Sequence, residues 1–285
     1  MDKELQEVTK AEGIYGSDIR LQVVGITRFS YPANIEAFNH SASTLQELQE
    51  VLYAHERLDQ RIHLFEQITL PAIRGQSDKD FALAILIGEN LPSKYQEKLE
   101  ALTGDIQQVH LVRKPEGSGH KEICLEILTS MRDAQSDLIA EFRLDDDDAV
   151  AVDFVERTRT IAMEIWPLVR SQKRVELDFC RGFLLDVKGP RATAREIVVP
   201  HWTPAQVYFC LPNSPLSIMS YRHTRFWTGN TSLSEAKPIM FVRGVHGDND
   251  SSVNFKKLKK SIRHMPEERV LKFLKQRFLI DIEKI

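Results

Sequence analysis

The segment LIAEFRLDDDD, residues 138–148, decides how this chain is interpreted, because an apolar run ends directly in four consecutive aspartates. Two carboxylates ~6 Å apart repel by about 0.7 kcal/mol in water and about 3 kcal/mol at an effective dielectric of 20. A bound divalent cation reverses the sign of that energy. Because Asp145 and Asp147 offer oxygen ligands, they predict a site for magnesium or manganese.

Two other interpretations of the acids remain open. The first is a solvated acidic loop or a helix N-cap, since Asp148 precedes an expected helix whose dipole stabilises anions. A cap needs one acid, however, and this segment has four. The second is the Asp-x-Asp-x-Thr motif of haloacid-dehalogenase phosphatases, which follows the first strand of that fold. In this chain Ala149 comes next, and the preceding strand is the fourth.

Working outward from the acids, strand-like and helix-like segments alternate along the first half of the chain. Apolar runs predict strands at 21–26, 81–87, 109–112 and 138–144. Helical spacing of apolar residues fills the intervals at 58–72, 92–102 and 120–132. This order predicts a parallel sheet covered by helices, with ligands beyond the carboxyl ends of its strands.

The second half of the chain has a different pattern. A long helix is expected over 154–168. Short strand-like runs follow at 175–179, 183–187, 197–199 and 207–211, separated by Gly, Pro and charged residues. They predict a mixed or antiparallel sheet with large loops. Residues 1–20 have little to pack and are expected to form a flexible lead.

Composition narrows the class of protein. The 285 residues carry a formal net charge of −3, which gives no general attraction to nucleic acid, and 42% are hydrophobic. Three separated cysteines, Cys124, Cys180 and Cys210, favour neither a disulfide framework nor a Cys-x-x-Cys zinc site. We expect a cytoplasmic protein, because the polar start lacks a signal-peptide pattern and no run of about 18 apolar residues occurs.

The order of these segments resembles a glycosyltransferase of the GT-A fold. More narrowly, Arg61 and the segments at 28–31, 64–66 and 143–148 resemble the bacterial rhamnosyltransferase family over roughly residues 21–251. The resemblance implies an α/β fold with a GT-A (Rossmann-like) mixed sheet flanked by helices. It implies one domain over 21–255, with a nucleotide-sugar half (21–150) and an acceptor half (151–255), followed by a basic C-terminal helix (256–285).

The implied activity is that of a metal-dependent hexosyltransferase in bacterial polysaccharide biosynthesis. It would move a sugar, rhamnose by the family's label, from a nucleoside-diphosphate sugar to a glycan or lipid-linked acceptor. By resemblance, Asp145 contacts the nucleotide ribose or the metal, Asp146 contacts the nucleotide and Asp147 binds the metal, while Asp148 is left as the helix cap. The metal stabilises the departing diphosphate.

His246 is the candidate for a further metal ligand, because GT-A enzymes often add one from a late strand. It follows a strand-like run at 239–242, and glycines at 244 and 247 flank it. Neutral imidazole is a common metal ligand. The alternative is an exposed loop histidine.

Three residues after the first strand, Thr27, Arg28 and Phe29, are candidates for holding the nucleotide. Phe29 could stack on the base, and Arg28 could pair with a phosphate or a base edge. Core packing accounts for Phe29 almost as well.

His120, Lys121 and Arg143 are further candidates for contact with the donor. His120 and Lys121 open a helix, where free backbone amides attract anions, although a solvent-exposed helix start is the simpler reading. Arg143 would reach the diphosphate. The slightly favoured alternative is an internal pair with Glu141, which shares its face of the strand by the two-residue period.

The catalytic base is the least determined residue. Asp186, at the end of the run at 183–187, is chosen narrowly, and a surface carboxylate is the alternative for each candidate. The carboxylates considered are Asp178, Asp186, Glu196, Glu235 and Asp248. The acceptor wall is expected among Trp202, Tyr208, Tyr221, His223, Phe226 and Trp227, several of which must be core residues.

Two functions other than sugar transfer stay open. One is a nucleotide-binding or carbohydrate-binding protein without turnover. The other is a sugar-phosphate nucleotidyltransferase, although this chain lacks a Gly-rich, Lys-containing loop after its first strand. The basic C-terminal helix could lie on an anionic membrane near a lipid-linked acceptor, but a helix docked on the domain is the favoured interpretation.

Overall fold

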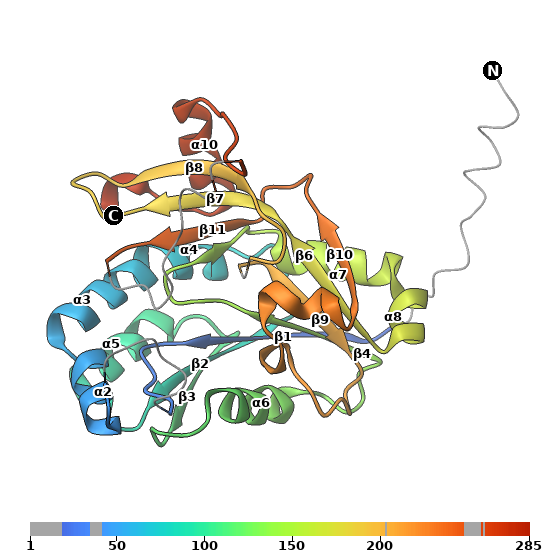
Figure 1. Cartoon of the computed structure of the whole chain (residues 1–285), viewed down its shortest axis with the longest axis horizontal. Helices are drawn as coiled ribbons and strands as arrows, with labels where there is room; N and C mark the ends of the chain where they lie inside the picture. The colour runs from blue at the N-terminus through green and yellow to red at the C-terminus, as the bar shows by residue number, and fades with distance from the viewer. Residues whose placement is uncertain (1–18, 35–41, 203, 248–257, 259) are drawn as a thin grey trace, which may run out of the picture.

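Two β-sheets organise the chain (Figure 1). The computed structural model describes residues 19–34, 42–202, 204–247, 258 and 260–285. The larger sheet has seven strands in the order β10-β6-β9-β4-β1-β2-β3, and the smaller has four in the order β5-β11-β7-β8. The predicted flexible lead lies outside the described residues, except for its last two positions.

The larger sheet is mixed. Its parallel half consists of β1 (Leu21–Arg28), β2 (Ala82–Gly88), β3 (Val109–Lys114) and β4 (Leu138–Arg143). Its other half consists of β9 (Gln206–Cys210), β6 (Arg174–Phe179) and β10 (Thr231–Glu235). Strand β9 is antiparallel to both β4 and β6, whereas β10 is parallel to β6. The predicted α/β architecture, a GT-A-like mixed sheet flanked by helices, is confirmed.

Helices cover both faces of the parallel half, which is why its strands are almost continuously apolar. On one face, α6 (His120–Met131) packs its residues Ile123 and Ile127 against Val24 and Ile26 of β1. The opposite face, which includes Val23, packs against α3 (His55–Leu64), α4 (Leu70–Arg74), α5 (Ser93–Thr103) and α7 (Phe154–Glu164).

The helix predicted over 58–72 forms with one irregularity. A π-helical turn, η3 (Phe65–Thr69), joins α3 to α4. Helix α2 (Leu45–Leu52) was not predicted. Its N-cap Thr44 accepts a hydrogen bond from the Glu47 amide, and the Glu47 carboxylate accepts one from the Ser43 amide. The Thr-x-x-Glu spacing, which is typical of a helix N-terminus, was visible in the sequence.

The smaller sheet begins directly after the four aspartates. Strand β5 (Ala149–Val150) pairs antiparallel with β11 (Phe241–Val245). Strand β7 (Arg181–Asp186) lies between β11 and β8 (Thr193–Val198). The sequence suggested that Asp148 caps a helix, and this prediction is wrong. Asp148 enters a strand, and α7 begins only after Asp153, the residue at its N-cap position.

The helix predicted over 154–168 is divided in two. Helix α7 ends at Glu164, and α8 (Trp166–Gln172) begins with Pro167 in its first turn. Proline has no amide hydrogen and is tolerated at the start of a helix rather than inside one. Within the described ranges, 3₁₀ segments form at η4 (Ile218–Ser220), η5 (His223–Thr228) and η6 (Ile282–Lys284).

The C-terminal helix α10 (Glu267–Arg277) is docked on the domain. Val270 and Leu274 are buried in the main core, and the Arg277 guanidinium donates to both carboxylate oxygens of Asp153, at 2.7 and 3.0 Å. The lysines at 256, 257 and 259, which begin the predicted basic C-terminal helix, lie outside the described residues. Among the helices that the structure describes, none has the length and apolarity needed to cross a membrane.

A buried ion pair fixes the segment that leads to η4 and η5. Arg132 donates through Nε and Nη2 to Glu141 Oε1, at 2.9 and 2.7 Å, and also donates to the carbonyls of Ser214 and Leu216. The Ile218 amide donates to Glu141 Oε2 at 2.8 Å. The favoured Glu141–Arg143 pair is thus wrong, because Arg132 reaches the Glu141 carboxylate and Arg143 lines a cavity instead.

We predict that Arg132→Met lowers the free energy of unfolding by about 3–5 kcal/mol, because it leaves the Glu141 carboxylate buried without its cation. Chemical denaturation measures the change. The matched control is Arg113→Met, which removes an exposed pair with Glu100 and should cost at most about 1 kcal/mol. Equal losses in the two variants would contradict a structural role for the buried pair.

Candidate functional site

The acidic loop at 144–148 crosses from the larger sheet to the smaller one. It leaves β4 with the Leu144 amide bonded to the Ile26 carbonyl of β1, at 3.0 Å. The Asp148 amide closes a turn onto the Asp145 carbonyl, at 3.1 Å. Thr69, in the π-helical turn, donates its hydroxyl to the Asp148 carbonyl at 2.8 Å. The backbone of the four acids is therefore held by both the central sheet and a helix.

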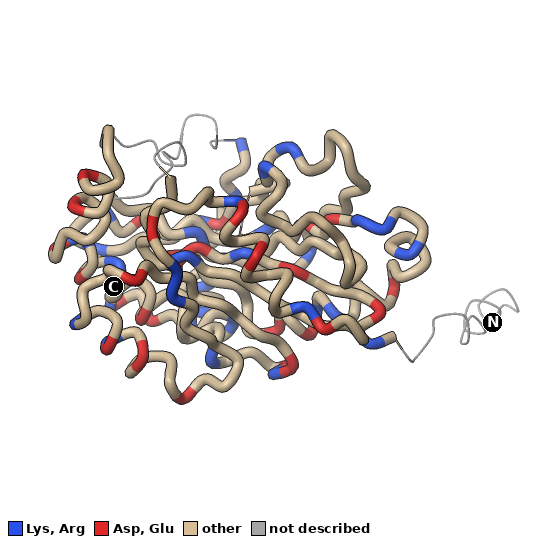
Figure 2. The backbone as a smooth tube through the Cα atoms, turned by 90° about the horizontal axis from the view of Figure 1, so that it is seen from below, with Lys and Arg blue, Asp and Glu red and all other residues tan. Residues whose placement is uncertain are grey.

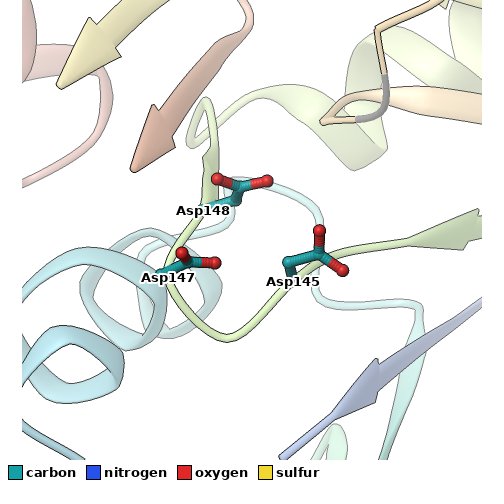
Figure 3. Close-up of side chains that lie close together, drawn as sticks. All are labelled: Asp145, Asp147 and Asp148. Atoms are coloured by element: carbon teal, nitrogen blue, oxygen red, sulfur yellow. The ribbon is translucent and has the colours of Figure 1, made fainter. Parts of the chain in front are cut away.

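Three of the four carboxylates converge. Asp145, Asp147 and Asp148 each offer an oxygen, and these oxygens all lie within 4.8 Å of one another (Figure 3). Burial raises the pKa of Asp148 well above its ordinary value, and the neighbouring Asp147 raises it further. A group of close carboxylate oxygens, two of them from buried residues, suits a hard divalent cation, so these residues fit the predicted magnesium or manganese.

Asp146 turns instead to Arg61 of α3. Arg61 Nε donates to Asp146 Oδ2 at 3.1 Å, and Nη2 contacts Asp146 Oδ1. The same guanidinium places Nη1 3.4 Å from Asp147 Oδ2. Burial by itself would raise the pKa of Asp147, but Arg61, followed by His246 and Arg243, outweighs it and lowers that pKa. One arginine thus neutralises part of the acidic loop.

His246, just beyond β11, lies where the sequence predicted a third ligand. Its Nε2 is 2.8 Å from Asp147 Oδ2 and 2.8 Å from Arg61 Nη1. Gly244 brings β11 close to the acids, because a Cβ there would collide with the Asp147 carbonyl. The Gly244 amide also donates to Asp148 Oδ1 at 2.9 Å.

A cavity of about 220 Å³ opens beside these acids. Basic and acidic residues are interspersed along the described backbone (Figure 2), yet cations gather around this cavity. Its lining includes Arg28, Arg57, Arg61, Arg143 and Arg243. Planar guanidinium groups suit the paired oxygens of phosphates, so the arginines and acids together provide for a diphosphate and its counter-cation.

The predicted donor contacts Arg28, His120 and Arg143 all line this cavity. Arg28 and Arg143 end the adjacent parallel strands β1 and β4, and His120 begins α6. Burial, followed by the charges of Arg28 and Arg143, lowers the pKa of His120 to about 3, so the imidazole is neutral at neutral pH. Burial likewise lowers the pKa of Arg143 to about 10.

Three of the predicted donor contacts lie outside the cavity lining. Thr27 is fully buried in β1, and Lys121 is exposed on α6. Phe29 is a core residue that packs edge-to-face on Phe65, with ring centroids 5.9 Å apart. Core packing, the alternative weighed for Phe29, accounts for its position, because a fully enclosed ring presents no face to a nucleobase.

Asp186 is also absent from the lining of the cavity beside the acids, although it pairs with Val245, the residue before His246. Its side chain lines a separate cavity of about 310 Å³ with Leu184, Thr193 and Arg195. Its carboxylate caps a local turn by accepting the Lys188 amide at 3.1 Å. Of the other carboxylates considered, Glu196 pairs with Arg181, and Asp248 lies outside the described residues.

The residues expected to form the acceptor wall lie partly in the core and partly at the cavity. Tyr208, Tyr221 and Phe226 pack on one another with ring centroids 4.6–5.7 Å apart. The Arg243 guanidinium lies 4.3 Å from the ring centroid of Trp202. His223 lines the cavity, and Trp227 is 56% exposed.

No role was predicted from the sequence for three arginines that line the cavity. Arg57 and Arg61 lie four positions apart on α3 and so share one face, a spacing that the sequence displayed. Arg243 alternates with Val242 and Gly244 along β11, but nothing in that alternation indicated which face would meet the acids.

Comparison with known proteins places the chain in a family. Residues 22–258 match the family described as "Putative rhamnosyl transferase". This match covers well over half of the sequence, and the chain therefore belongs to that glycosyltransferase family. None of the curated proteins matches it.

Among solved structures, Staphylococcus aureus TarS (residues 1–349) in complex with UDP-GlcNAc has a TM-score of 0.43 and 8% identity, covering 90% of this chain and 72% of TarS. TarS in complex with UDP has a TM-score of 0.39 and 9% identity, covering 80% of this chain. This chain spans 61% of that TarS chain. Likeness at this level is too remote to carry a functional conclusion.

We predict that Arg61→Met destabilises the metal-free protein by about 3–5 kcal/mol, because Asp146 and Asp147 then stay buried without their cation. Added Mn²⁺ should raise the melting temperature of this variant more than that of the wild type, because the metal ion replaces the positive charge that the substitution removes. Differential scanning calorimetry measures both effects.

The control for this prediction is Arg74→Met, which removes an exposed pair with Asp105. It should change stability by less than about 1 kcal/mol and leave the response to Mn²⁺ unaltered. If Arg61→Met melted like the wild type both with and without Mn²⁺, the guanidinium would not be balancing the acids.

Proposed function

We propose that this protein is a metal-dependent glycosyltransferase that moves a sugar from a nucleoside-diphosphate sugar to a glycan or glycolipid acceptor. The main observation behind this proposal is that three carboxylates converge with five arginines around one cavity at the carboxyl ends of β1 and β4. Membership of the rhamnosyl transferase family supports rhamnose as the transferred sugar.

In this proposal the acidic loop holds the cation, and the arginines hold the donor. Asp145, Asp147 and Asp148, together with His246, would be the ligands of a magnesium or manganese ion. When bound, that ion supplies Lewis-acid stabilisation of the departing diphosphate. Asp146 would hold the Arg61 guanidinium in place, because both its carboxylate oxygens contact that group.

Arg28 and Arg143 are assigned to the phosphate oxygens. They end neighbouring strands, so their guanidinium groups approach the cavity from a rigid part of the sheet. Charge-assisted pairs between arginine and phosphate are strong and geometrically specific. Neutral His120, at the start of α6, provides a polar group beside them without adding to the positive charge.

We predict that the wild type releases nucleoside diphosphate from at least one donor in a panel that includes dTDP-rhamnose and UDP-GlcNAc, with Mn²⁺ present. Asp147→Asn should lower kcat by about 100-fold or more, because it removes a charge that holds the metal at the leaving group. Asp186→Asn, which alters a carboxylate of the separate cavity, should stay within about threefold of the wild type.

The alternatives give different results in the same assay. Release of pyrophosphate from a nucleoside triphosphate and a sugar phosphate would identify a nucleotidyltransferase. Binding of a donor without release of any product would identify a protein that recognises the nucleotide sugar but does not turn it over. Equal activity of the wild type and Asp147→Asn would refute the proposed role of the acidic loop.

We further predict that a cognate donor raises the melting temperature, and raises it more when Mn²⁺ is present, because the cation completes the diphosphate site. A ligand at 100 times its Kd adds about 2.7 kcal/mol to the stability of the folded state. Arg143→Met should abolish most of this shift, whereas Arg113→Met, on the exposed edge strand β3, should preserve it. Thermal-shift measurements with and without the metal separate these outcomes.

A further inference from the structure

His223 combines a place in the cavity lining with a ring nitrogen that can accept a hydrogen bond. It begins η5 and lines the same cavity as Arg143 and the acidic loop. Its Nδ1 lies 3.0 Å from the backbone carbonyl oxygen of His201. Because a carbonyl oxygen can only accept, Nδ1 must carry the hydrogen, and Nε2 of the neutral ring keeps its lone pair. Within the part of the chain that the structure describes, Nε2 has no hydrogen-bond partner.

The carbonyl that sets this tautomer is itself held by buried acids. His201 adopts a left-handed backbone conformation, with φ of 56°, which is unusual for a residue with a side chain. Its amide donates to Asp178 Oδ2 at 2.7 Å, and its ring nitrogen Nδ1 lies 3.2 Å from Glu176 Oε2. Ser232 donates to that same Glu176 oxygen at 2.6 Å. These contacts over-determine a strained residue, as is common at functional sites.

The surroundings keep the ring of His223 neutral. Burial, followed by the charges of Arg143, Arg243 and His201, lowers the pKa of His223 to about 4, although the hydrogen bond to the His201 carbonyl opposes this shift. The ring is therefore neutral at neutral pH, and its Nε2 lone pair is available to accept a hydrogen bond. His120, the other neutral imidazole of the cavity, has its Nε2 enclosed by protein, so it cannot reach an entering molecule in the same way.

We propose that His223 is the general base of the transfer reaction, an inference that rests on the proposed function. The acceptor hydroxyl gives its proton to His223 Nε2 while its oxygen forms the new bond to the anomeric carbon. The bond from that carbon to the diphosphate oxygen breaks, and its electron pair leaves with the nucleoside diphosphate. The imidazolium that forms keeps its Nδ1 hydrogen bond to the His201 carbonyl.

The geometry favours His223 over the carboxylates of the acceptor half. Asp178 uses one oxygen on the His201 amide and the Ser234 hydroxyl, and it is absent from the residues that line the cavity. Asp186 lines the separate cavity. The carboxylates that do line the cavity belong to the acidic loop, where Arg61 and the proposed cation require them as anions.

The first test is His223→Asn, assayed by nucleoside diphosphate release with Mn²⁺ and the best donor. The Asn side-chain amide can still donate to the His201 carbonyl, so the loop keeps its support while the base is removed. We expect kcat to fall by about 100-fold or more, with the KM for donor within about threefold of the wild type. His110→Asn, on the exposed face of β3, is the matched control and should stay at wild-type activity.

The second test is His223→Ala with added imidazole. Exogenous imidazole should restore turnover by at least about tenfold, in proportion to its unprotonated fraction, because a free base can occupy the vacated space. A merely structural role would not give that pH-dependent rescue. The inference is overturned if His223→Asn keeps a kcat within threefold of the wild type, if its KM rises as much as its kcat falls, or if imidazole restores nothing.

Loss of the proposed function and loss of the proposed base alone give different results. A wild type that turns over no donor refutes the proposed function, and the base falls with it. An active wild type together with an active His223→Asn refutes the base alone and leaves the glycosyltransferase assignment intact.

Discussion

The arrangement of the site depends on the Arg61 guanidinium, which lies among Asp146, Asp147 and His246. Four successive carboxylates at the end of a buried strand would repel one another strongly in a medium of low dielectric. One fixed cation on α3 removes part of that repulsion and separates the acids into two groups. Asp146 pairs with the arginine through both its oxygens, whereas the other three converge, and Asp147 belongs to that group while also contacting the arginine.

The same division explains why two sheets are needed. The parallel half of the larger sheet delivers the acids and the arginines at strand ends, as expected for open α/β folds. The smaller sheet then brings Gly244 and His246 against the loop from the other direction. A site of opposite charges is thus assembled from elements of both sheets, which the acidic loop and the short strand β5 join.

Much of the fold could be predicted from periodicity, because strands buried on both faces and helices with one apolar stripe leave distinct patterns. The alternation before Asp145 and the change of pattern after it both appear in the structure. The partners of charged groups could not be predicted. Glu141 pairs with Arg132 rather than Arg143, and Asp148 enters a strand rather than a helix. Pairing across the chain depends on which element lies opposite, and a two-residue strand leaves no periodic signal.

The pairing of β5 with β11 also has a consequence for how the chain folds. Arg61 and His246 are 185 positions apart in sequence, and Asp147 and His246 are 99 apart, yet all three meet in one contact group. Contacts of such separation form only after a large loss of chain entropy, so they come late relative to the local strand–helix units. During synthesis the acidic loop therefore lacks its contact with His246 until β11 has left the ribosome. The stretch of acids that ends as a buried site begins as a charged segment, and charges that flank an apolar strand oppose its aggregation.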